Sequence, residues 1–305
     1  MFIATSTFGD FSNESIDHLR QNELDVCLNK LGRKLTDNEL IKFAEKCDSI
    51  IAGTENYSRR VLERLPHLKV ISRLGIGMDN IDIEATKNKG IKIYKTKTTP
   101  APAVAELVLA LMIDVSRHIS HSNQLVKNGN WNKKMGFLLF GKTLGIIGLG
   151  TIGKELVKVS KGFGFHILAF DKQEDVNFAD EHDVTYCDLY TLLSKSHFIS
   201  IHLNLSDETK YFIDEEKIKL MNPESILINT SRGEVLDEKA LYGALKTEKL
   251  GGAGLDVFHQ EPYSGPLTGL DNVVLTPHIG AYAKELRIQM EMEAAENLIR
   301  GLNEV

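Results

Sequence analysis

Residues 141–171 read GKTLGIIGLGTIGKELVKVSKGFGFHILAFD, and this stretch decides the fold class of the chain. It opens with an apolar run, Thr143–Ile147, that has the length and the β-branched content of a buried strand. Three glycines in G-x-G-x-x-G spacing follow, then a segment of near-helical apolar period, and then a second apolar strand that ends on Asp171. This order of strand, glycine motif, helix, strand and acid predicts a Rossmann-type α/β fold with a doubly wound parallel sheet.

The three glycines of the motif have separate physical tasks. Gly148 permits the tight turn, Gly150 lets a pyrophosphate approach the backbone, and Gly153 lets the helix pack close to the strand. The N-terminus of that helix offers free N–H groups and the positive end of its dipole to the phosphate. Asp171 is placed to accept hydrogen bonds from the adenosine ribose, and its charge would repel a 2′-phosphate. The expected cofactor is therefore NAD rather than NADP.

Length and composition are those of an ordinary globular chain. The 305 residues suffice for two domains, and a content of 42% hydrophobic and 26% charged residues is typical of soluble proteins. The formal net charge of −6 offers no electrostatic footprint for nucleic acid or an anionic membrane. The start lacks the pattern of a signal peptide, and the apolar run Leu107–Ile113 is too short to span a bilayer. We expect a cytoplasmic protein with neither nucleic acid nor membrane as a partner.

Three cysteines, Cys27, Cys47 and Cys187, lie far apart in the sequence. Such an odd and sparse set predicts reduced, buried thiols rather than a disulfide framework. No group of His, Cys and Asp residues shows the spacing of metal ligands, so no metal site is expected.

Apolar strands alternate with amphipathic helices on both sides of the proline-containing stretch Lys95–Pro102, which marks a domain boundary. A capping box, Thr36 with Glu39, begins one early helix. The strands expected before the boundary are Met1–Thr5, Ser49–Gly53, Lys69–Arg73 and Ile91–Lys95. Those expected after it are Leu144–Ile147, Ile167–Phe170, Val184–Cys187, Phe198–Leu203, Ser225–Thr230, Gly252–Val257 and Val273–Leu275.

Three further segments complete the chain. Ala103–Ile119 is an almost wholly apolar helix, which we expect to be buried between two domains or two subunits. Residues 120–140 are polar and irregular around Trp131, and no role follows from them. The last segment, Ala283–Leu302, carries the apolar stripe of a helix.

Three ionisable residues follow expected strands in the second half of the chain: Arg232 in NTSRG, Glu261 in DVFHQEP and His278 in TPHIG. Ligand sites of open α/β sheets lie at the carboxyl ends of the strands, so the three residues could share one crevice. A guanidinium can bind a carboxylate, a histidine can exchange a hydroxyl proton while hydride moves, and a carboxylate can orient the histidine. Each residue alone could equally be a solvated loop residue, so spacing leaves the choice open.

Seven ordered motifs resemble the D-2-hydroxyacid dehydrogenase family along nearly the whole chain. They are SRLGIGMDNIDIEA (72–85), TTPAPAVAELVLALM (98–112), GKTLGIIGLGTIGKEL (141–156), AFD (169–171), LINTSRGEVLDEKAL (227–241), GAGLDVFHQEP (252–262) and NVVLTPHIGA (272–281). The resemblance implies an NAD-dependent oxidoreductase that moves hydride between the cofactor and a 2-hydroxy or 2-oxo acid.

The resemblance also implies roles for individual residues of the second half. The catalytic triad of the family carries over to Arg232, Glu261 and His278. The aspartate that contacts the nicotinamide carboxamide carries over to Asp256. Further cofactor contacts are expected at Thr151, Ile152, Thr230, Ser231 and Gly280.

The substrate carboxylate is expected on backbone N–H groups of a glycine loop, Gly75, Ile76 and Gly77, because an anion cradle needs unusual backbone angles. Arg73 matches an arginine that helps bind the substrate phosphate in some 3-phosphoglycerate dehydrogenases of the family. It could equally pair with a surface carboxylate. A second phosphate-binding arginine of those enzymes falls where this chain has Ala52.

Family topology implies two domains. Residues 1–97, completed by residues 281–305, would form a flavodoxin-like substrate-binding domain, and residues 98–280 would form the inserted NAD-binding Rossmann domain. Members usually dimerise through the cofactor domain, so a homodimer is expected, and the apolar helix Ala103–Ile119 is compatible with it.

Several functions remain open from the sequence. The first is oxidation of 3-phosphoglycerate or reduction of 3-phosphohydroxypyruvate. The second is reduction of glyoxylate, hydroxypyruvate or a specialised 2-oxo acid, since Tyr282 stands where phosphoglycerate dehydrogenases have a smaller residue and could close the pocket. The third is an NAD(H)-sensing binding protein, like the transcriptional corepressors that resemble the family.

Overall fold

The computed structural model describes residues 1–304, and the chain forms two compact units. The first unit contains Met1–Pro100 and the chain from Tyr282 onward, and the second contains Ala101–Ala281. The second unit is therefore an insertion in the first.

The first unit is built on a five-stranded parallel sheet with the strand order β2-β1-β3-β4-β5. This 2-1-3-4-5 order is the flavodoxin-like one. The strands are β1 (Phe2–Ile3), β2 (Cys27–Leu28), β3 (Ser49–Ala52), β4 (Val70–Arg73) and β5 (Lys92–Lys95).

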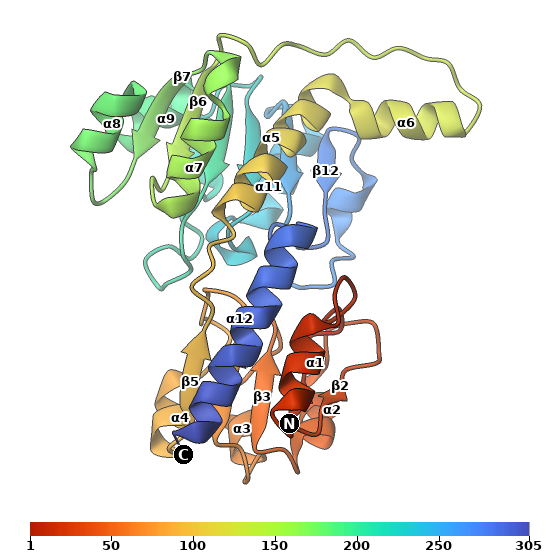
Figure 1. Cartoon of the computed structure of the whole chain (residues 1–305). Helices are drawn as coiled ribbons and strands as arrows, with labels where there is room; N and C mark the ends of the chain where they lie inside the picture. Colours follow the sequence, from red (N-terminus) through yellow and green to blue (C-terminus); the bar gives the residue numbers. More distant parts are fainter. Residues whose placement is uncertain (305) are drawn as a thin grey trace. The chain divides into compact units, whose positions relative to one another are not determined.

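Helices cover both faces of this sheet (Figure 1). On one face lie α1 (Glu14–Gln21) and α12 (Lys284–Asn303), whose apolar residues share a core cluster with Ile3 and Ile51. The other face carries α2 (Asp37–Ala44), α3 (Arg59–Glu63) and α4 (Ile83–Asn88). The expected capping box of α2 is confirmed, because Thr36 accepts from the Glu39 N–H and Glu39 accepts from the Thr36 N–H.

The helix α12 is tied to the loop after β1 by a buried ion pair. Arg287 Nε donates to Glu291 Oε1 at 2.7 Å, and both side chains are almost fully buried. The second Glu291 oxygen accepts from the Gly9 N–H, while Arg287 Nη2 donates to Thr7 Oγ1. Thr7 also bonds the Tyr282 hydroxyl at 2.7 Å. The loop at the carboxyl end of β1 is thus held by charged groups of the last helix.

The second unit is built on a seven-stranded parallel sheet with the order β12-β11-β10-β9-β6-β7-β8. The chain winds outward in both directions from β6, so the order reverses between β6 and β9, as in a Rossmann fold. The strands are β6 (Thr143–Ile147), β7 (His166–Phe170), β8 (Val184–Tyr186), β9 (Phe198–Ile201), β10 (Ile226–Asn229), β11 (Gly252–Leu255) and β12 (Val273–Leu275). The predicted doubly wound fold is confirmed.

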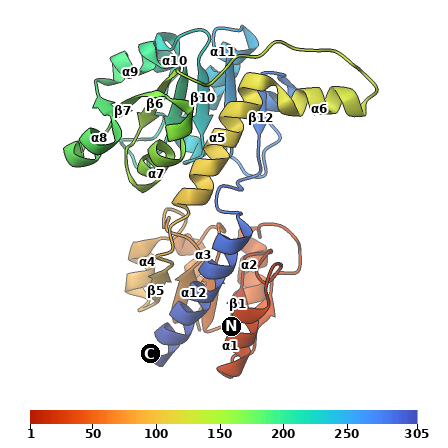
Figure 2. The same cartoon turned by 45° about the horizontal axis from the view of Figure 1, so that its top comes forward.

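Helices cover the two faces of this sheet (Figures 1 and 2). One core cluster joins the sheet to α5 (Ala101–Arg117), α7 (Thr151–Val159) and α8 (Val176–His182). The other joins it to α9 (Leu189–Lys195), α10 (Glu215–Leu220) and α11 (Glu238–Lys246). Three short 3-10 turns, η1 (Lys161–Phe163), η2 (Gly233–Val235) and η3 (Pro266–Gly269), complete the unit. The apolar helix α5 is therefore buried against its own sheet and α7, and this burial requires no second subunit.

Residues 120–140 are more regular than the sequence indicated. His118 adopts a left-handed backbone (φ 52°) that ends α5, and a new helix, α6 (Ile119–Lys127), begins immediately. The first turn of α6 is stabilised by Asp114, which accepts from the Ser120 N–H at 2.7 Å. In Figures 1 and 2, α6 extends away from the sheet of its unit, and a long irregular stretch returns from it to β6. The helix is largely polar, so apolar periodicity did not predict it. The bond from Asp114 contributes to its stability instead.

Two other expectations were wrong. The edge strand β2 was not expected, because two residues of mixed polarity carry no recognisable period. The cysteines were expected to be buried, but Cys27 is exposed and Cys47 and Cys187 are partly exposed. Within residues 1–304, no helix is long and apolar enough to cross a membrane.

Two helical glycines provide a matched test of the packing. A Cβ at Gly301 in α12 would stand 2.6 Å from the Tyr94 ring and 2.7 Å from a Val70 methyl group, whereas one at Gly243 in α11 would meet nothing within 4 Å. We expect Gly301→Ala to lower the free energy of unfolding by about 1–2 kcal/mol, since overpacking outweighs the gain in helix propensity. Gly243→Ala should raise it by up to about 1 kcal/mol. Denaturant titration followed by circular dichroism distinguishes the two, and equal effects would contradict the packing of α12.

Candidate active site

The glycine motif forms the turn between β6 and α7. Gly148 has a positive φ of 94°, and a Cβ there would stand 2.7 Å from the His202 carbonyl oxygen. A Cβ at Gly153 would stand 2.5 Å from the Gly148 carbonyl oxygen, so this glycine is what allows α7 to lie against the turn. Gly150 is different, because it is exposed and a Cβ there would meet nothing within 4 Å. The packing of the protein therefore requires glycine at positions 148 and 153. Gly150 leaves open space before the N-terminus of α7.

Asp171 directly follows β7 and bonds the same turn. Its Oδ2 accepts from the Leu149 N–H at 2.7 Å, and its Oδ1 accepts from the Gln173 N–H at 2.9 Å. Each carboxylate oxygen has a second lone pair, so Asp171 can brace the glycine turn and still accept from a ribose hydroxyl. Thr151 and Ile152 begin α7 beside Gly150, where a phosphate would meet free N–H groups.

The motif NTSRG begins at Asn229, the last residue of β10. Asn229 shapes the loop that follows, although it was not among the expected site residues. Its side-chain Nδ2 donates to the Arg232 carbonyl at 2.9 Å, and its Oδ1 accepts from the N–H and hydroxyl groups of Ser231. The fully buried Asn229 therefore holds Arg232 in an extended conformation. Thr230 lies in the same loop with a buried hydroxyl that bonds no other group of the described chain. An asparagine that bonds the backbone two residues ahead is a recognised turn signal, so the sequence did carry this information.

The NTSRG loop and the loop after β11 pack backbone to backbone. A Cβ at Gly233 would stand 2.1 Å from the Phe258 carbonyl carbon and 2.5 Å from the His259 nitrogen. Because β10, β11 and β12 are parallel neighbours, the loops that carry Arg232, Glu261 and His278 leave the same edge of the sheet.

Glu261 and His278 form the central pair of the site. His278 Nδ1 lies 2.9 Å and 3.0 Å from the two carboxylate oxygens of Glu261. A carboxylate accepts hydrogen bonds, so Nδ1 carries a proton and Nε2 is left for a substrate. His278 itself adopts a left-handed backbone (φ 58°), which is uncommon for a residue other than glycine and costs free energy that the surrounding structure must offset.

Asp256 provides that support. Its Oδ1 accepts from the Thr276 hydroxyl at 2.6 Å and the Ile279 N–H at 2.8 Å, and its Oδ2 accepts from the Gly280 N–H at 2.8 Å. Burial raises the pKa of Asp256, while these donors and the nearby His278 oppose that rise. One buried carboxylate thus holds both sides of the His278 loop. Thr276 was not among the expected site residues, because its role depends on a partner 20 residues earlier in the chain.

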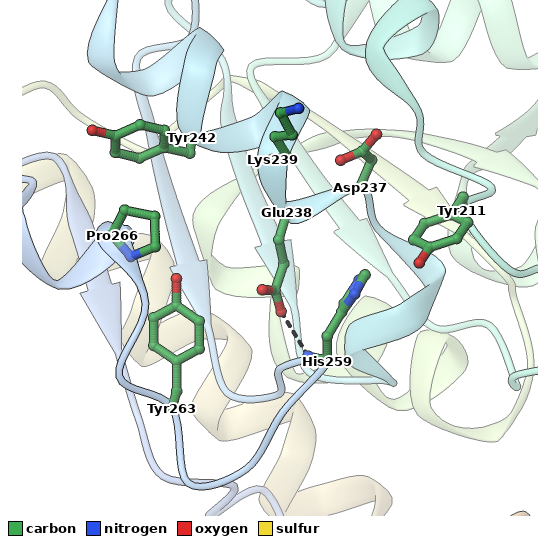
Figure 3. Close-up of a pocket in the computed structure, with 8 residues that line it drawn as sticks. All are labelled: Tyr211, Asp237, Glu238, Lys239, Tyr242, His259, Tyr263 and Pro266. Carbon is green, nitrogen blue, oxygen red and sulfur yellow. Dashed lines mark hydrogen bonds between the residues drawn. The ribbon is translucent and has the colours of Figure 1, made fainter.

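A pocket of about 430 Å³ lies beside the loop after β11, which carries His259 and Tyr263. Figure 3 shows the Glu238 side chain between Tyr263 and His259, where its Oε1 accepts from the His259 N–H at 2.6 Å. His259 Nε2 lies 2.7 Å from the Leu236 carbonyl oxygen, which can only accept, so this nitrogen is the protonated one. These bonds fix the backbone two residues before Glu261. The lining residues are Tyr211, Asp237, Glu238, Lys239, Tyr242, His259, Tyr263 and Pro266.

The expected substrate-binding residues belong to the first unit, at the carboxyl end of β4. Gly75 has a φ of 138°, but its N–H is taken by the Thr96 hydroxyl at 3.0 Å and the Arg73 carbonyl at 3.1 Å. Within residues 1–304, the N–H groups of Ile76 and Gly77 donate to no other group of the protein, and Ile76 is exposed. An anion could use these two N–H groups.

Arg73 is buried rather than presented at the surface. It is 7% exposed, and its Nη1 donates to the Leu74 carbonyl and, at 3.5 Å, to the Ala52 carbonyl. The guanidinium lies directly over Gly75, since a Cβ on that glycine would stand 2.9 Å from Nη1.

The second unit fits a dinucleotide cofactor on its own geometry. Open space at Gly150, the N-terminus of α7, Asp171 beyond it and the unbonded Thr230 hydroxyl are the features that such a ligand would use. Within residues 1–304, no group of three or more His, Cys, Asp or Glu side chains could hold a metal ion.

Comparison with known proteins identifies the family of this chain. Residues 109–280 match the model of the NAD-binding domain of D-isomer specific 2-hydroxyacid dehydrogenases. The chain is 41% identical over 271 residues to a glyoxylate reductase of Thermococcus litoralis, which covers 85% of this chain and 82% of the relative. It is 39% identical over 291 residues to a hydroxypyruvate reductase of Thermotoga maritima, with 93% of both chains covered.

Two further relatives complete the comparison. A D-3-phosphoglycerate dehydrogenase of Methanocaldococcus jannaschii is 41% identical over 274 residues, which cover 88% of this chain but only 52% of the relative. The crystal structure of the TT0316 protein of Thermus thermophilus superimposes with a TM-score of 0.89 at 31% identity, over 99% of this chain and 96% of that one. The chain belongs to the D-isomer specific 2-hydroxyacid dehydrogenase family. It is an NAD-dependent oxidoreductase that acts on the CH–OH group of a 2-hydroxy acid.

The open space at Gly150 provides a direct test of cofactor placement. We expect Gly150→Val to fold normally but to raise the Kd for NADH at least about tenfold, because the side chain occupies the approach of the pyrophosphate. Gly162→Val is the matched control, since Gly162 also has open space but lies outside the turn. Titration of NADH fluorescence measures both, and an unchanged Kd for Gly150→Val would place the pyrophosphate elsewhere.

Proposed function

We propose that this enzyme reduces a short, unphosphorylated 2-oxo acid with NADH, and that glyoxylate and hydroxypyruvate are its first candidate substrates. The observation that carries the proposal is the burial of Arg73, whose guanidinium donates to the backbone carbonyls of Leu74 and Ala52. An arginine that binds a phosphate must present its charge and its N–H groups to that ligand. Ala52 supplies no second cation in the neighbouring strand.

The relatives support the same choice. The glyoxylate reductase and the hydroxypyruvate reductase align over 82% and 93% of their own lengths.

In the proposed reaction, residues bind the substrate, bind the cofactor or move a proton. The first unit binds the substrate carboxylate through the N–H groups of Ile76 and Gly77, and Arg232 holds the carboxylate and the carbonyl by charge. The second unit binds NADH, which supplies the hydride. His278 delivers a proton from Nε2 to the carbonyl oxygen, so that C=O becomes CH–OH, while Glu261 stabilises the charge on the imidazole. We further propose that Asp256 contacts the nicotinamide carboxamide beside its structural bonds.

A second candidate is 3-phosphohydroxypyruvate. The position of Arg73 at the end of β4, directly over Gly75, favours it, because a rotation of this side chain would bring a cation to the substrate loop. Kinetics with a set of acids separate the two candidates.

The first measurement follows NADH absorbance with glyoxylate, hydroxypyruvate, 3-phosphohydroxypyruvate, 2-oxoglutarate and pyruvate. We expect the two short unphosphorylated acids to give the highest kcat/KM. We also expect His278→Ala to lower kcat about 10²–10⁴-fold with the Kd for NADH unchanged, because only the proton transfer is lost. His166→Ala, an exposed histidine of the same unit, should retain wild-type rates.

Other outcomes of this measurement are equally informative. A preference for the phosphorylated acid that disappears in Arg73→Ala would replace the proposal by its second candidate. Binding of NADH with no turnover of any acid would instead favour a cofactor-sensing role.

We also propose that the enzyme is a homodimer formed through the second unit. Several apolar side chains of α6 and residues 131–140 are exposed, and an apolar patch of this kind usually marks a protein contact. Trp131 is 81% exposed and Met135 92% exposed. Phe137 anchors the segment by packing near Phe198, so the segment is held against its own unit. The other exposed members are Ile119, Val126, Leu138 and Phe140.

The dimer can be tested through this segment. We expect the double change Met135→Asp and Leu138→Asp to halve the mass measured by light scattering, because two charges cannot be buried in an apolar contact. Trp131 is the single tryptophan of the chain, so its fluorescence should shift to the red in the variant. Tyr190→Asp, a change at an exposed site on α9, is the control. A wild-type protein that is monomeric at micromolar concentration would refute the proposal.

We place the enzyme in the cytoplasm, since three free cysteines, one of them exposed, suit a reducing compartment.

A further inference from the structure

A cluster of buried polar side chains lies at the carboxyl edge of the first sheet, beside the loop Gly75–Gly77. Glu55 is 2% exposed and follows β3, Tyr57 is fully buried two residues later, and Arg73 ends the neighbouring β4. Charged side chains are seldom buried so completely unless they serve a purpose, because each must be compensated. No step of the reaction described above uses Glu55.

Glu55 is held firmly in this position. Its Oε2 accepts from the Gly53 N–H at 3.0 Å. The packing around Gly53 is tight, since a Cβ there would stand 2.8 Å from Oε2 and 2.6 Å from the Thr5 hydroxyl. Asn80, which follows the glycine loop, donates to the carbonyls of Gly53 and Glu55 at 3.0 Å and 2.6 Å. The segment that carries Glu55 is therefore bonded to the segment that carries Gly75–Gly77.

The charges of this cluster act on one another. Burial raises the pKa of Glu55, and this rise is opposed by backbone N–H groups of Glu55 and Gly53 and, to a smaller extent, by the charges of Lys34 and Arg73. The Tyr57 hydroxyl has its pKa raised well above its usual range by burial and by the charge of Glu55. Arg73 remains charged at every working pH. A negative and a positive side chain thus share one buried environment, with the positive one directly over Gly75.

We propose that Glu55 is a specificity-determining residue, whose buried carboxylate offsets the charge of Arg73 and so rejects substrates that carry a second anionic group such as phosphate. Glu55 then offsets charge of Arg73 beneath the substrate loop, and a single carboxylate is bound by N–H groups instead of by a cation. A phosphate near this loop would lose its water without a full countercharge from Arg73, so its binding is disfavoured. Discrimination against an unwanted ligand commonly uses such an unfavourable element.

This inference rests on the proposed function for its kinetic test, so the test includes an arm that needs no turnover. Glu55→Gln keeps the shape of the side chain and an oxygen for the Gly53 N–H while it removes the charge. Glu63→Gln, an exposed glutamate on α3, is the matched control for the loss of one negative charge from the same unit.

The kinetic arm compares kcat/KM for 3-phosphohydroxypyruvate with kcat/KM for hydroxypyruvate. We expect Glu55→Gln to raise this ratio at least about tenfold, since the charge of Arg73 is then no longer offset. The ratio should stay at the wild-type value in Glu63→Gln. An unchanged ratio in a folded Glu55→Gln protein overturns the inference.

The binding arm uses the melting temperature of the protein with saturating NADH. Glycolate and 2-phosphoglycolate differ by one phosphate, and we expect wild-type protein to be stabilised more by glycolate. In Glu55→Gln, the stabilisation by 2-phosphoglycolate should exceed that of the wild type. Stronger stabilisation of the wild type by 2-phosphoglycolate than by glycolate overturns the inference without any variant.

The two failures can be told apart. Absence of turnover with every acid in the wild type refutes the proposed function, and the binding arm then still decides whether Glu55 rejects phosphate. Turnover of short acids with an unchanged ratio in Glu55→Gln refutes the role of Glu55 alone.

Discussion

The parallel pairing of β6 with β7 on one side and with β9 on the other is the constraint on which the cofactor-binding unit depends. It places the end of β6 at the point where the strand order reverses, so the following turn opens into a crevice and not onto a helix. The turn itself has almost no freedom, because backbone oxygens stand where side chains of Gly148 and Gly153 would be. The loops after β10, β11 and β12 leave the same edge for the same reason, which is that parallel strands end together.

Buried polar groups convert this edge into a defined site. Asp256 holds the loop of His278 by three hydrogen bonds, and Asn229 holds the loop of Arg232 by three more. Burying such groups is costly unless all their bonds are made, and here the partners are loop atoms that water would otherwise hold. The surroundings therefore impose the left-handed backbone at His278. They also fix the imidazole so that Nδ1 bonds Glu261. Orientation of the imidazole is therefore prepared before a substrate arrives.

Arg73 is the charged group of the first unit whose direction matters most for the proposed substrate. At the end of β4 a cation could serve a phosphate, yet Arg73 donates to the carbonyls of Leu74 and Ala52 and shares its environment with Glu55. The Gly75 N–H is bonded to Thr96, so the proposed carboxylate site of the glycine loop consists of the N–H groups of Ile76 and Gly77. Substrate choice in this view depends on charge compensation below the loop as much as on residues within it.

The sequence by itself determined the elements whose signals are local. The glycine motif with Asp171, the capping box of Thr36, the apolar strands of both sheets, and the motifs around Arg232, Glu261 and His278 were all recognisable, because each is a short pattern with a fixed backbone consequence. Only the tertiary structure decided the contacts between distant residues. Thr96 occupies the Gly75 N–H, Arg73 is directed inward, and Asp256 reaches the loop of His278. Side-chain direction and charge compensation depend on which segments the fold brings together, and no local pattern records that.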